Sequence, residues 1–459
     1  MLIVLLLVSS SYVGLSISST GIGVEKTYAK PLYTTHDPIY INGNDNFTGE
    51  NGVTGGLGTS NDPYIIGDWV IEGDSSTSTG IFVNNTNVYF IIRNCTVYNF
   101  YHTDEYHSGI KLSYVENGMI ENSSVFKSHT CINIRYSVNT TIINCSCYDF
   151  PYLYGYGINC YRSKYITIKS CECYNLYVGV DLSKSSDIII ENTNCYNNTL
   201  SGLDSFAVEP TTMHLVIKDC KFYENKWHGI RLSEREFHPS YSQIVNCEFF
   251  NNGIETKVSA LSIDRLCDNI IENCSFHHNW KGIGITTERN IIRNCSVFNN
   301  MRQGISIYGY VGVRAFTKFN KIVNCNIYNN SIGIQFWTSI GSVAENCNIY
   351  NNSWHGIYNG MFSMVRIKHN NIYDNGYDEM FEAPCGMWSM WFCFVDARDN
   401  WWGSENGPRM YRFGYLGIIP IKIIGNEKII RSRSIIMYRP WAKEPIPDAG
   451  VRLSHYFLV

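Results

Sequence analysis

Charge and alanine are both scarce in this 459-residue chain. Charged residues make up only 17%, and 36 Lys and Arg against 40 Asp and Glu leave a formal charge of −4. Because no basic runs occur, this balance excludes the electrostatic footprint of a nucleic-acid-binding protein. Nine alanines are too few for long helices. No Walker motif, zinc-type cysteine pair or His-Glu-x-x-His sequence occurs either, so these nucleotide and zinc signatures are absent.

Long apolar runs are also rare, since the only one is Met1 to Val8, which small and hydroxyl residues follow up to Thr20. This run has the length of the apolar part of a secretory signal rather than that of a membrane-spanning helix. We therefore expect residues 1–25 to be a signal peptide or, because no Lys or Arg precedes the run, an N-terminal anchor. The mature protein is expected to be secreted or bound to the cell surface.

A repeat is the most prominent feature that the chain does contain. One phrase, Ile-Ile-Arg-Asn-Cys-Ser-Val-Phe-Asn-Asn, ends at Asn300 and recurs in variant form along the sequence. Successive copies lie 21 to 30 residues apart, and their cysteine position is occupied by Cys95, Ser123, Cys145, Cys171, Thr193, Cys220, Cys247, Cys274, Cys295, Cys325, Cys347, Asn370 and Asn400. The shortest spacings correspond to one structural turn, and the excess indicates loop insertions.

A second phrase of the Gly-Ile type precedes most of these positions by about 13 residues, as at Gly282-Ile283 and Gly333-Ile334. Each repeat therefore contains two or three short strands, which cannot bury a face alone but can do so when coils stack about 4.8 Å apart. The pattern predicts an all-β protein, a right-handed parallel β-helix of about twelve or thirteen coils over residues 33–425. A C-terminal tail, residues 426–459, is expected to follow it, with its segment 431–446 packed back along the coils.

This register predicts vertical columns of side chains. Asn before the cysteine position suits a corner, because Asn tolerates the left-handed conformation. The position two residues after the cysteine, as at Cys147 and Cys173, is expected to point inward, and the next position forms an almost wholly aromatic column whose rings stack. Of the seventeen cysteines, nine occupy the repeat position, and we interpret them as an interior ladder of small apolar side chains, with disulfides or a metal site as the alternatives.

Over nearly the whole mature chain, the sequence resembles archaeal right-handed β-helix surface proteins grouped with NosD-like and pectate-lyase-like repeat domains. The opening resembles theirs at 36–41, 55–58 and 62–66, and the close at 399–404, Gly407-Pro408 and 439–441. The resemblance implies a solenoid that handles polysaccharide or forms part of the cell envelope. The NosD name alone implies a role in copper handling.

A site on such a solenoid is a patch drawn from adjacent coils. In line with the Gly-Ile phrase, the outward column is expected to read Lys111, Asn133, Asn159, Asp181, Ala207, Arg231, Ser262 and Gly284. The next outward column includes Glu209 and Asp264, and the position ahead of the phrase includes Asp204 and His228. We predict Asp204, Glu209, His228 and Arg231 as catalytic residues, and Asp181, Asp264, Trp227 and Trp280 as substrate-binding residues.

Three kinds of chemistry fit this patch. Its carboxylates suit a Ca²⁺ ion that holds a uronate, with His228 or Arg231 moving a proton at the carbon next to the sugar carboxylate. Paired acids suit glycoside hydrolysis instead. The third possibility is that the charges are solvated and that Arg231 pairs with an acidic neighbour.

Two further patterns bear on function. Met380, Cys385, Met387, Met390 and Cys393 form a stretch rich in ligands suited to Cu(I), although an apolar loop over the end of the solenoid explains it as well. Sequons at Asn46, Asn84, Asn122, Asn139, Asn197, Asn329 and Asn351 fit a surface glycoprotein.

The first functional hypothesis is a carbohydrate-binding or structural envelope protein, with a glycan and other envelope proteins as partners. The alternatives are a polysaccharide lyase, epimerase or glycoside hydrolase that acts on a uronate-type glycan, and a NosD-like copper-handling protein. Ca²⁺ is the one cofactor that the pattern suggests.

Overall fold

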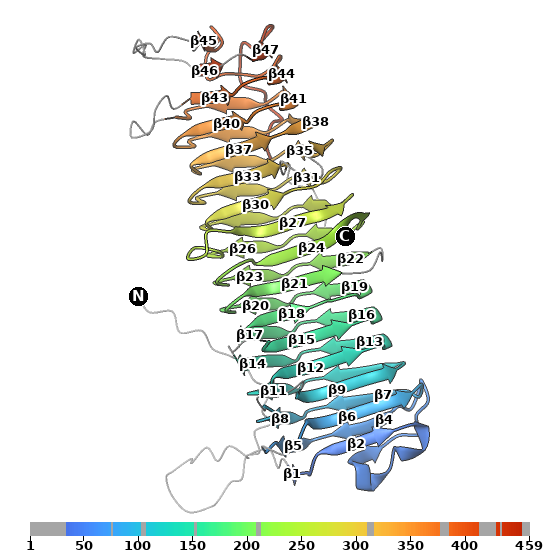
Figure 1. The fold of residues 1–459 in the computed structure, drawn as a ribbon. Helices are drawn as coiled ribbons and strands as arrows, with labels where there is room; N and C mark the ends of the chain where they lie inside the picture. The colour runs from blue at the N-terminus through green and yellow to red at the C-terminus, as the bar shows by residue number, and fades with distance from the viewer. Residues whose placement is uncertain are drawn as a thin grey trace, which may run out of the picture.

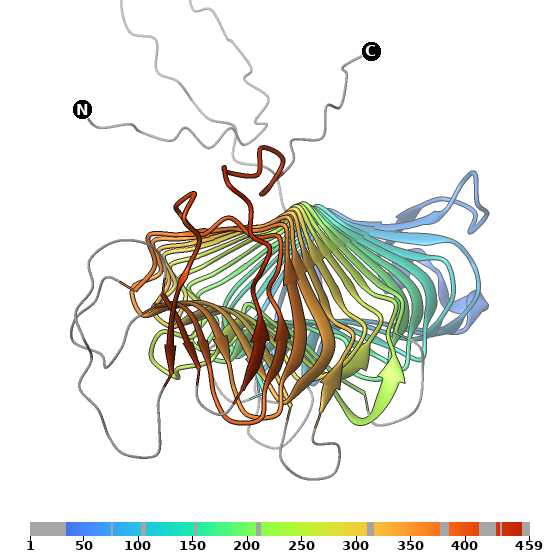
Figure 2. The same ribbon diagram turned by 90° about the horizontal axis from the view of Figure 1, so that it is seen from above.

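The computed structural model describes residues 34–74, 77–101, 107–150, 154–207, 213–309, 316–376, 385–412, 428–431 and 434–451. Over these ranges the chain winds into one solenoid, seen from the side in Figure 1 and along its length in Figure 2. The expected signal segment, residues 1–25, lies outside the described residues. Within them, no helix has the length and apolarity needed to cross a bilayer.

Three sheets form the walls of the solenoid, and each coil contributes one strand to each wall. Sheet A contains β1 (Thr34–Thr35), β5 (Trp69–Glu72), β8 (Thr96–Tyr98), β11 (Ser124–Phe126), β14 (Ser146–Phe150), β17 (Glu172–Leu176), β20 (Asn194–Tyr196), β23 (Lys221–Tyr223), β26 (Glu248–Phe250), β29 (Ser275–His277), β32 (Ser296–Phe298), β36 (Asn326–Tyr328), β39 (Asn348–Tyr350) and β42 (Asn371–Tyr373).

Sheet B carries the candidate site. It contains β2 (Ile39–Asn42), β6 (Thr79–Thr86), β9 (Ser108–Val115), β12 (Thr130–Arg135), β15 (Tyr156–Tyr161), β18 (Val178–Asp181), β21 (Ser201–Ala207), β24 (Ile230–Pro239), β27 (Ser259–Cys267), β30 (Lys281–Ile285), β33 (Gln303–Tyr308), β37 (Ile332–Trp337), β40 (His355–Asn359), β43 (Cys385–Ser389), β46 (Lys428–Arg431) and β45 (Arg409–Arg412).

Sheet C closes the cross-section. It contains β3 (Val53–Gly55), β4 (Tyr64–Gly67), β7 (Phe90–Arg93), β10 (Gly118–Glu121), β13 (Val138–Ile143), β16 (Lys164–Lys169), β19 (Ser186–Glu191), β22 (Leu215–Lys218), β25 (Gln243–Val245), β28 (Ile270–Glu272), β31 (Ile291–Arg293), β34 (Thr317–Lys318), β35 (Lys321–Val323), β38 (Ser339–Glu345), β41 (Met364–Lys368), β44 (Phe394–Asp396) and β47 (Ile435–Met437). Two short 3₁₀ helices, η1 (Asn44–Asn46) and η2 (Gly49–Asn51), lie at the N-terminal end.

The predicted parallel β-helix is confirmed. Every strand pair described is parallel except β3 with β4, and divergent coils at the two ends extend the sheets to 14 and 16 strands. Beyond residue 425, β46 pairs with β43 and β47 pairs with β44. The chain then runs back along sheet A, where the Gly450 amide donates to the Asn346 carbonyl oxygen at 2.7 Å.

The interior is built from the columns that the repeat predicts. In sheet A, Cys147, Cys173 and Cys195 lie in register, and the next coil places Phe222 in the same column. All seventeen cysteines are buried and free, which confirms the interior ladder in place of disulfides. The aromatic column also stacks as predicted, with Tyr148 and Tyr174 centroids 5.0 Å apart and nearly parallel.

Asparagine has two separate functions at the corners. The Asn residues before the cysteine position adopt the left-handed conformation, as at Asn94 (φ 53) and Asn144 (φ 52), which confirms the prediction. A second set is buried and forms ladders, in which Asn279 accepts from the Asn252 amide at 2.9 Å and donates to the Phe249 carbonyl at 2.9 Å. Because a buried N–H or C=O left unpaired is costly, these ladders stabilise the corners.

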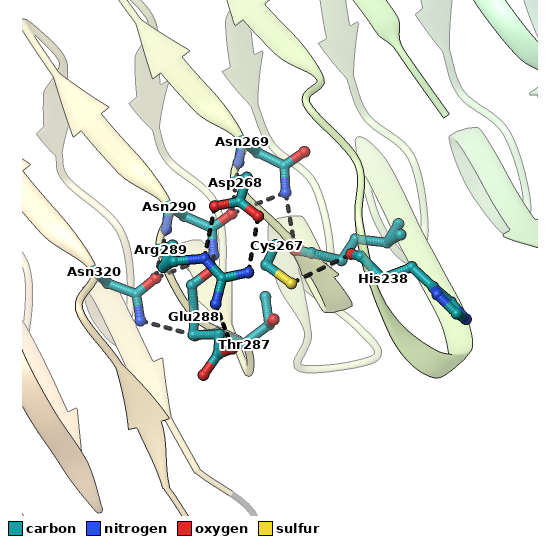
Figure 3. Close-up of polar contacts among 10 residues, drawn as sticks. His238, Cys267, Asp268, Asn269, Thr287, Glu288, Arg289, Asn290 and Asn320 are labelled. Atoms are coloured by element: carbon teal, nitrogen blue, oxygen red, sulfur yellow. Dashed lines mark hydrogen bonds and ion pairs between the residues drawn. The ribbon is translucent and has the colours of Figure 1, made fainter. Parts of the chain in front are cut away.

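Figure 3 shows such a ladder at the corner between sheets B and C, where Asn269 donates to Asn290 at 2.8 Å and Asn290 donates to Asn320 at 3.0 Å. Beside it, Arg289 forms two hydrogen bonds with Asp268, at 2.8 and 2.9 Å. This charged group has its partners within the protein and lies at the surface, so we treat it as structural.

Candidate functional site

The outward column of sheet B brings three of the predicted residues together. Asp181 of β18 lies opposite Asp204 of β21, and Asp204 lies opposite Arg231 of β24. This corrects the predicted register, which had Ala207 in the column and Asp204 ahead of the phrase. In this coil the phrase begins at Gly202. A glycine is needed there, because a Cβ would lie 2.9 Å from the side-chain amide nitrogen of the buried Asn225.

Asp204 and Arg231 form a two-point ion pair. The Arg231 Nε donates to Oδ1 of Asp204 at 3.0 Å, and Nη2 donates to Oδ2 at 2.6 Å. The Asp204 side chain is 8% exposed and that of Arg231 34%. Burial raises the pKa of Asp204, and the guanidinium of Arg231 opposes this rise. The pair therefore holds a nearly buried carboxylate at the outer face of the sheet, as one alternative predicted.

Asp181 is the most perturbed acid of the column. It is 8% exposed, and burial together with the charge of Asp204 raises its pKa to about 7. Ser183 donates to Oδ1 at 2.9 Å and Asn159 donates to Oδ2 at 2.7 Å. Because its pKa lies near neutrality, Asp181 is able to give and take a proton at physiological pH.

His228 is a neutral imidazole with a defined tautomer. Its Nδ1 lies 2.6 Å from the Ser259 carbonyl oxygen, which can only accept, so Nδ1 carries the proton. Burial lowers the pKa of His228 to about 4, and the charge of Arg231 adds to this effect. Among the described residues Nε2 has no hydrogen-bond partner, which leaves its lone pair available as a base.

His228 and Asp204 lie on adjacent coils, because the Gly202 amide donates to the His228 carbonyl oxygen at 3.0 Å. Asp204 is three residues beyond Ser201, however, so the two residues are offset by about 10 Å along the strands. Arg231, on the strand that follows His228, connects them electrostatically. The two side chains therefore lie at different places along the strand direction.

The other predicted residues lie at the edges or apart. Glu209 falls outside the described residues. Asp264 lies opposite Ser233, as the predicted second outward column requires, and it accepts from Thr286 at 2.5 Å. Trp227 directly precedes His228 and is 38% exposed.

Trp280 lies two coils further along the solenoid. Its ring carries the cations of Lys257 at 5.8 Å and Arg302 at 5.6 Å. These cations limit its availability for stacking on a ligand.

Sequence reasoning missed three groups in this region. Tyr156 lies close to the column, since burial and then the charges of Asp181 and Asp204 raise its pKa. Ser201 Oγ is buried without a partner. Glu234 is 2% exposed, its Oε1 has no partner, and burial raises its pKa to about 7. The alternation from Ile230 and Leu232 places Glu234 at an inward position, and that signal was present in the sequence.

The region does not fit the expected Ca²⁺ ion. Both oxygens of Asp204 accept hydrogen bonds from Arg231, which leaves Asp181 as the one carboxylate of the column without a cation of its own. A calcium ion requires six or more oxygen ligands. Among the described residues no three His, Cys, Asp or Glu side chains are grouped so that they could hold a metal ion.

The soft-ligand stretch yields one contact between two potential ligands. Cys385 Sγ lies 3.3 Å from Nδ1 of the buried His355. Cys393 Sγ instead donates to the Gly360 carbonyl at 2.9 Å, and Met380 is outside the described residues. The two cysteines therefore have separate partners.

The fold is a parallel solenoid with polar residues aligned on one outer sheet. A comparison with family models identifies the family of proteins that has this fold. The family described as "Right handed beta helix region" matches residues 79–239, 237–315 and 268–388, which is more than half of the chain. The chain belongs to this family, and its winding is right-handed as predicted. No curated protein matches the chain.

Several solved structures are similar in fold. The periplasmic alginate epimerase AlgG is 13% identical, with 82% of this chain and 78% of that chain covered and a TM-score of 0.39. The A-module of the Azotobacter vinelandii mannuronan C-5 epimerase AlgE6 is 11% identical, with 81% and 83% covered and a TM-score of 0.38. The pectate lyase Pel9A is 13% identical, with 74% and 79% covered and a TM-score of 0.31. At these identities the similarity concerns the fold alone.

Proposed function

We propose that the protein binds a glycan across the outer face of sheet B, at Asp181, Asp204, His228 and Arg231. The observation that carries the proposal is the burial of two carboxylates in an outward column whose neighbouring positions are Asn159 and Ser262. Burying such groups costs stability. Groups kept in spite of that cost are more often functional than structural.

The chemistry of the patch suits a sugar. Asp181 and the free Nε2 of His228 accept hydrogen bonds from hydroxyl groups, while Arg231 and Tyr156 offer donors. Trp227, at the edge of the patch, provides an exposed ring face for stacking. The proposal includes export to the cell surface and a place among other envelope components, and it draws both from the apolar N-terminal run and the sequons.

A second candidate function is catalysis on a polysaccharide. Two observations favour it: the pKa of Asp181 of about 7 and the unprotonated Nε2 of His228. In an epimerase or lyase, His228 would remove the proton from the carbon next to a uronate carboxylate. In a glycoside hydrolase, Asp181 would be the general acid.

A glycan array followed by product analysis tests both functions. We expect the native protein to retain at least one polysaccharide, and Asp181→Asn and His228→Asn to weaken retention. Asp268→Asn is the matched control, because it disrupts another two-point Asp–Arg pair at a different corner. Cleaved or epimerised product from the native protein alone would establish catalysis. If no glycan is retained, or if all three variants behave like the native protein, the proposed site is wrong.

A further inference from the structure

A cavity of about 640 Å³ lies at the N-terminal end of the solenoid, away from the patch on sheet B. It opens at the corner that follows β6, β9 and β12, where hydrogen bonds of Asn44 join η1 to the coils. Its lining includes Asn44, Asp45, Asn85, Tyr114, Glu116 and Tyr136. None of these residues belongs to the site proposed above, which begins about two coils further along.

Aromatic rings form one wall of this cavity at a strained backbone position. Tyr114 and Tyr136 follow residues that lie in register, and both adopt the left-handed conformation, with φ of 53 and 51. A bulky side chain there is a conformational outlier. Asn85 holds the equivalent position one coil earlier, also with φ 53. Asn therefore fits the same corner that the two tyrosines occupy.

The stack of rings ends inside the cavity. Tyr114 and Tyr136 are parallel, with centroids 4.9 Å apart, and Arg162 covers the far side of Tyr136 with its guanidinium carbon 6.0 Å from the ring centroid. On the near side, the short Asn85 leaves a face of Tyr114 uncovered. The coil spacing of about 4.8 Å is also the spacing of stacked rings, so the cavity is the next place in the stack.

The cavity has a polar rim. Hydrogen bonds within the protein hold the residues on one side of this rim, and the carboxylates on the other side are available to a ligand. Asn44 donates to Asn87 at 2.9 Å and accepts from Thr86 at 2.7 Å, which holds η1 against the coils. Asp45 and Glu116 are exposed, and among the described residues neither carboxylate has a hydrogen-bond or ion-pair partner. Both residues line a cavity that also has an aromatic wall.

We propose that this cavity binds a neutral pyranose residue of a glycan. The apolar face of the sugar ring stacks on Tyr114, and its hydroxyl groups donate to Asp45 and Glu116. Two carboxylates without a cation repel a uronate, so the site selects uncharged sugars. This inference does not rest on the sheet B patch, which is a separate site with different residues.

Tyr114→Asn tests the proposal, because it removes the ring and introduces the residue that the same corner uses at Asn85. Asn favours the left-handed conformation, so the melting temperature is expected to stay equal or rise. Tyr165→Asn is the matched control: Tyr165 is also an exposed left-handed tyrosine, with φ 56, but it lies outside the cavity.

Titration calorimetry with cellohexaose, mannohexaose, maltohexaose and a hexauronate provides the measurement. We expect at least one neutral hexaose to bind, Tyr114→Asn to weaken it by about tenfold or more, and Tyr165→Asn to bind as the native protein does. Glu116→Gln is expected to weaken binding less than Tyr114→Asn.

Three results would overturn the inference: no neutral hexaose binds, Tyr114→Asn binds as tightly as the native protein, or Glu116→Gln changes only the binding of Ca²⁺ added alone. Asp181→Asn separates the two sites. If it abolishes binding while Tyr114→Asn has no effect, this inference fails and the proposed function stands. If only Tyr114→Asn weakens binding, this inference stands and the proposed function fails.

Discussion

Asp181→Asn is expected to make the protein more stable at neutral and alkaline pH. The pKa of Asp181 rises from 3.8 to about 7 on folding, so the folded state binds more protons than the unfolded state between these values. The ionisation of Asp181 therefore leaves the free energy of unfolding unaffected below about pH 4 and lowers it as the pH rises. Above pH 7 the full loss of stability is reached. This rise of about three pKa units corresponds to a loss of stability of about 4 kcal/mol at most. Asn carries no charge and avoids this penalty.

Melting temperatures of the native protein and the variant at pH 4.5 and pH 8 provide the assay. The variant should melt a few degrees higher at pH 8, and the difference should fall to about a quarter of that value at pH 4.5, just above the unfolded-state pKa. Asp396→Asn is a control of opposite sign, because Arg398 and then Lys368 lower the pKa of Asp396 to about 2. That variant should be less stable than the native protein at both pH values. A variant at position 181 that is less stable at pH 8, or a pH-independent difference, would refute the reasoning.

Three further predictions follow from the site and the core. In Asp181→Asn, which removes the group of the patch that titrates near pH 7, glycan binding should not change between pH 5 and 8, because the pKa of His228 is about 4; a titration step near 6.5 in that variant would show that the imidazole is not buried. Asn279→Ala should lower the free energy of unfolding by about 2–4 kcal/mol, because it leaves the buried Asn252 amide unpaired, whereas Asn299→Ala, at an exposed corner, should cost less; equal losses would contradict the ladder. All seventeen cysteines are free, so seventeen thiols should react in denaturant and few in the native protein, and a lower count in denaturant would indicate disulfides.

The regular coils could be predicted from the sequence because each repeats the same local pattern. The Cys147–Cys173 column and the left-handed Asn corners recur with constant neighbours, so one repeat predicts the next. The coil of Asp204 was misaligned by three residues because its phrase is Gly202-Leu203 rather than Gly-Ile. An insertion follows it, so composition alone left two alignments open, and contacts with Asn225 and Arg231 select one of them.

Some of the candidate site was also predictable. The register pointed to Asp181, Asp204, His228 and Arg231 before any geometry was considered. The Asp204–Arg231 ion pair was foreseen as one alternative. The tautomer of His228 was not, because it depends on a carbonyl oxygen 31 residues away in sequence.

The periodicity of the chain by itself determined a parallel solenoid, its columns and the face on which a patch would lie. Only the stacking of particular coils decided that Asp181 is buried beside Asp204, that Nε2 of His228 is free, and that Tyr114 has an uncovered face. The physical reason is that burial, charge and ring contacts at each outward position come from residues 20 to 30 positions away. Loops of variable length set which of those residues becomes the neighbour.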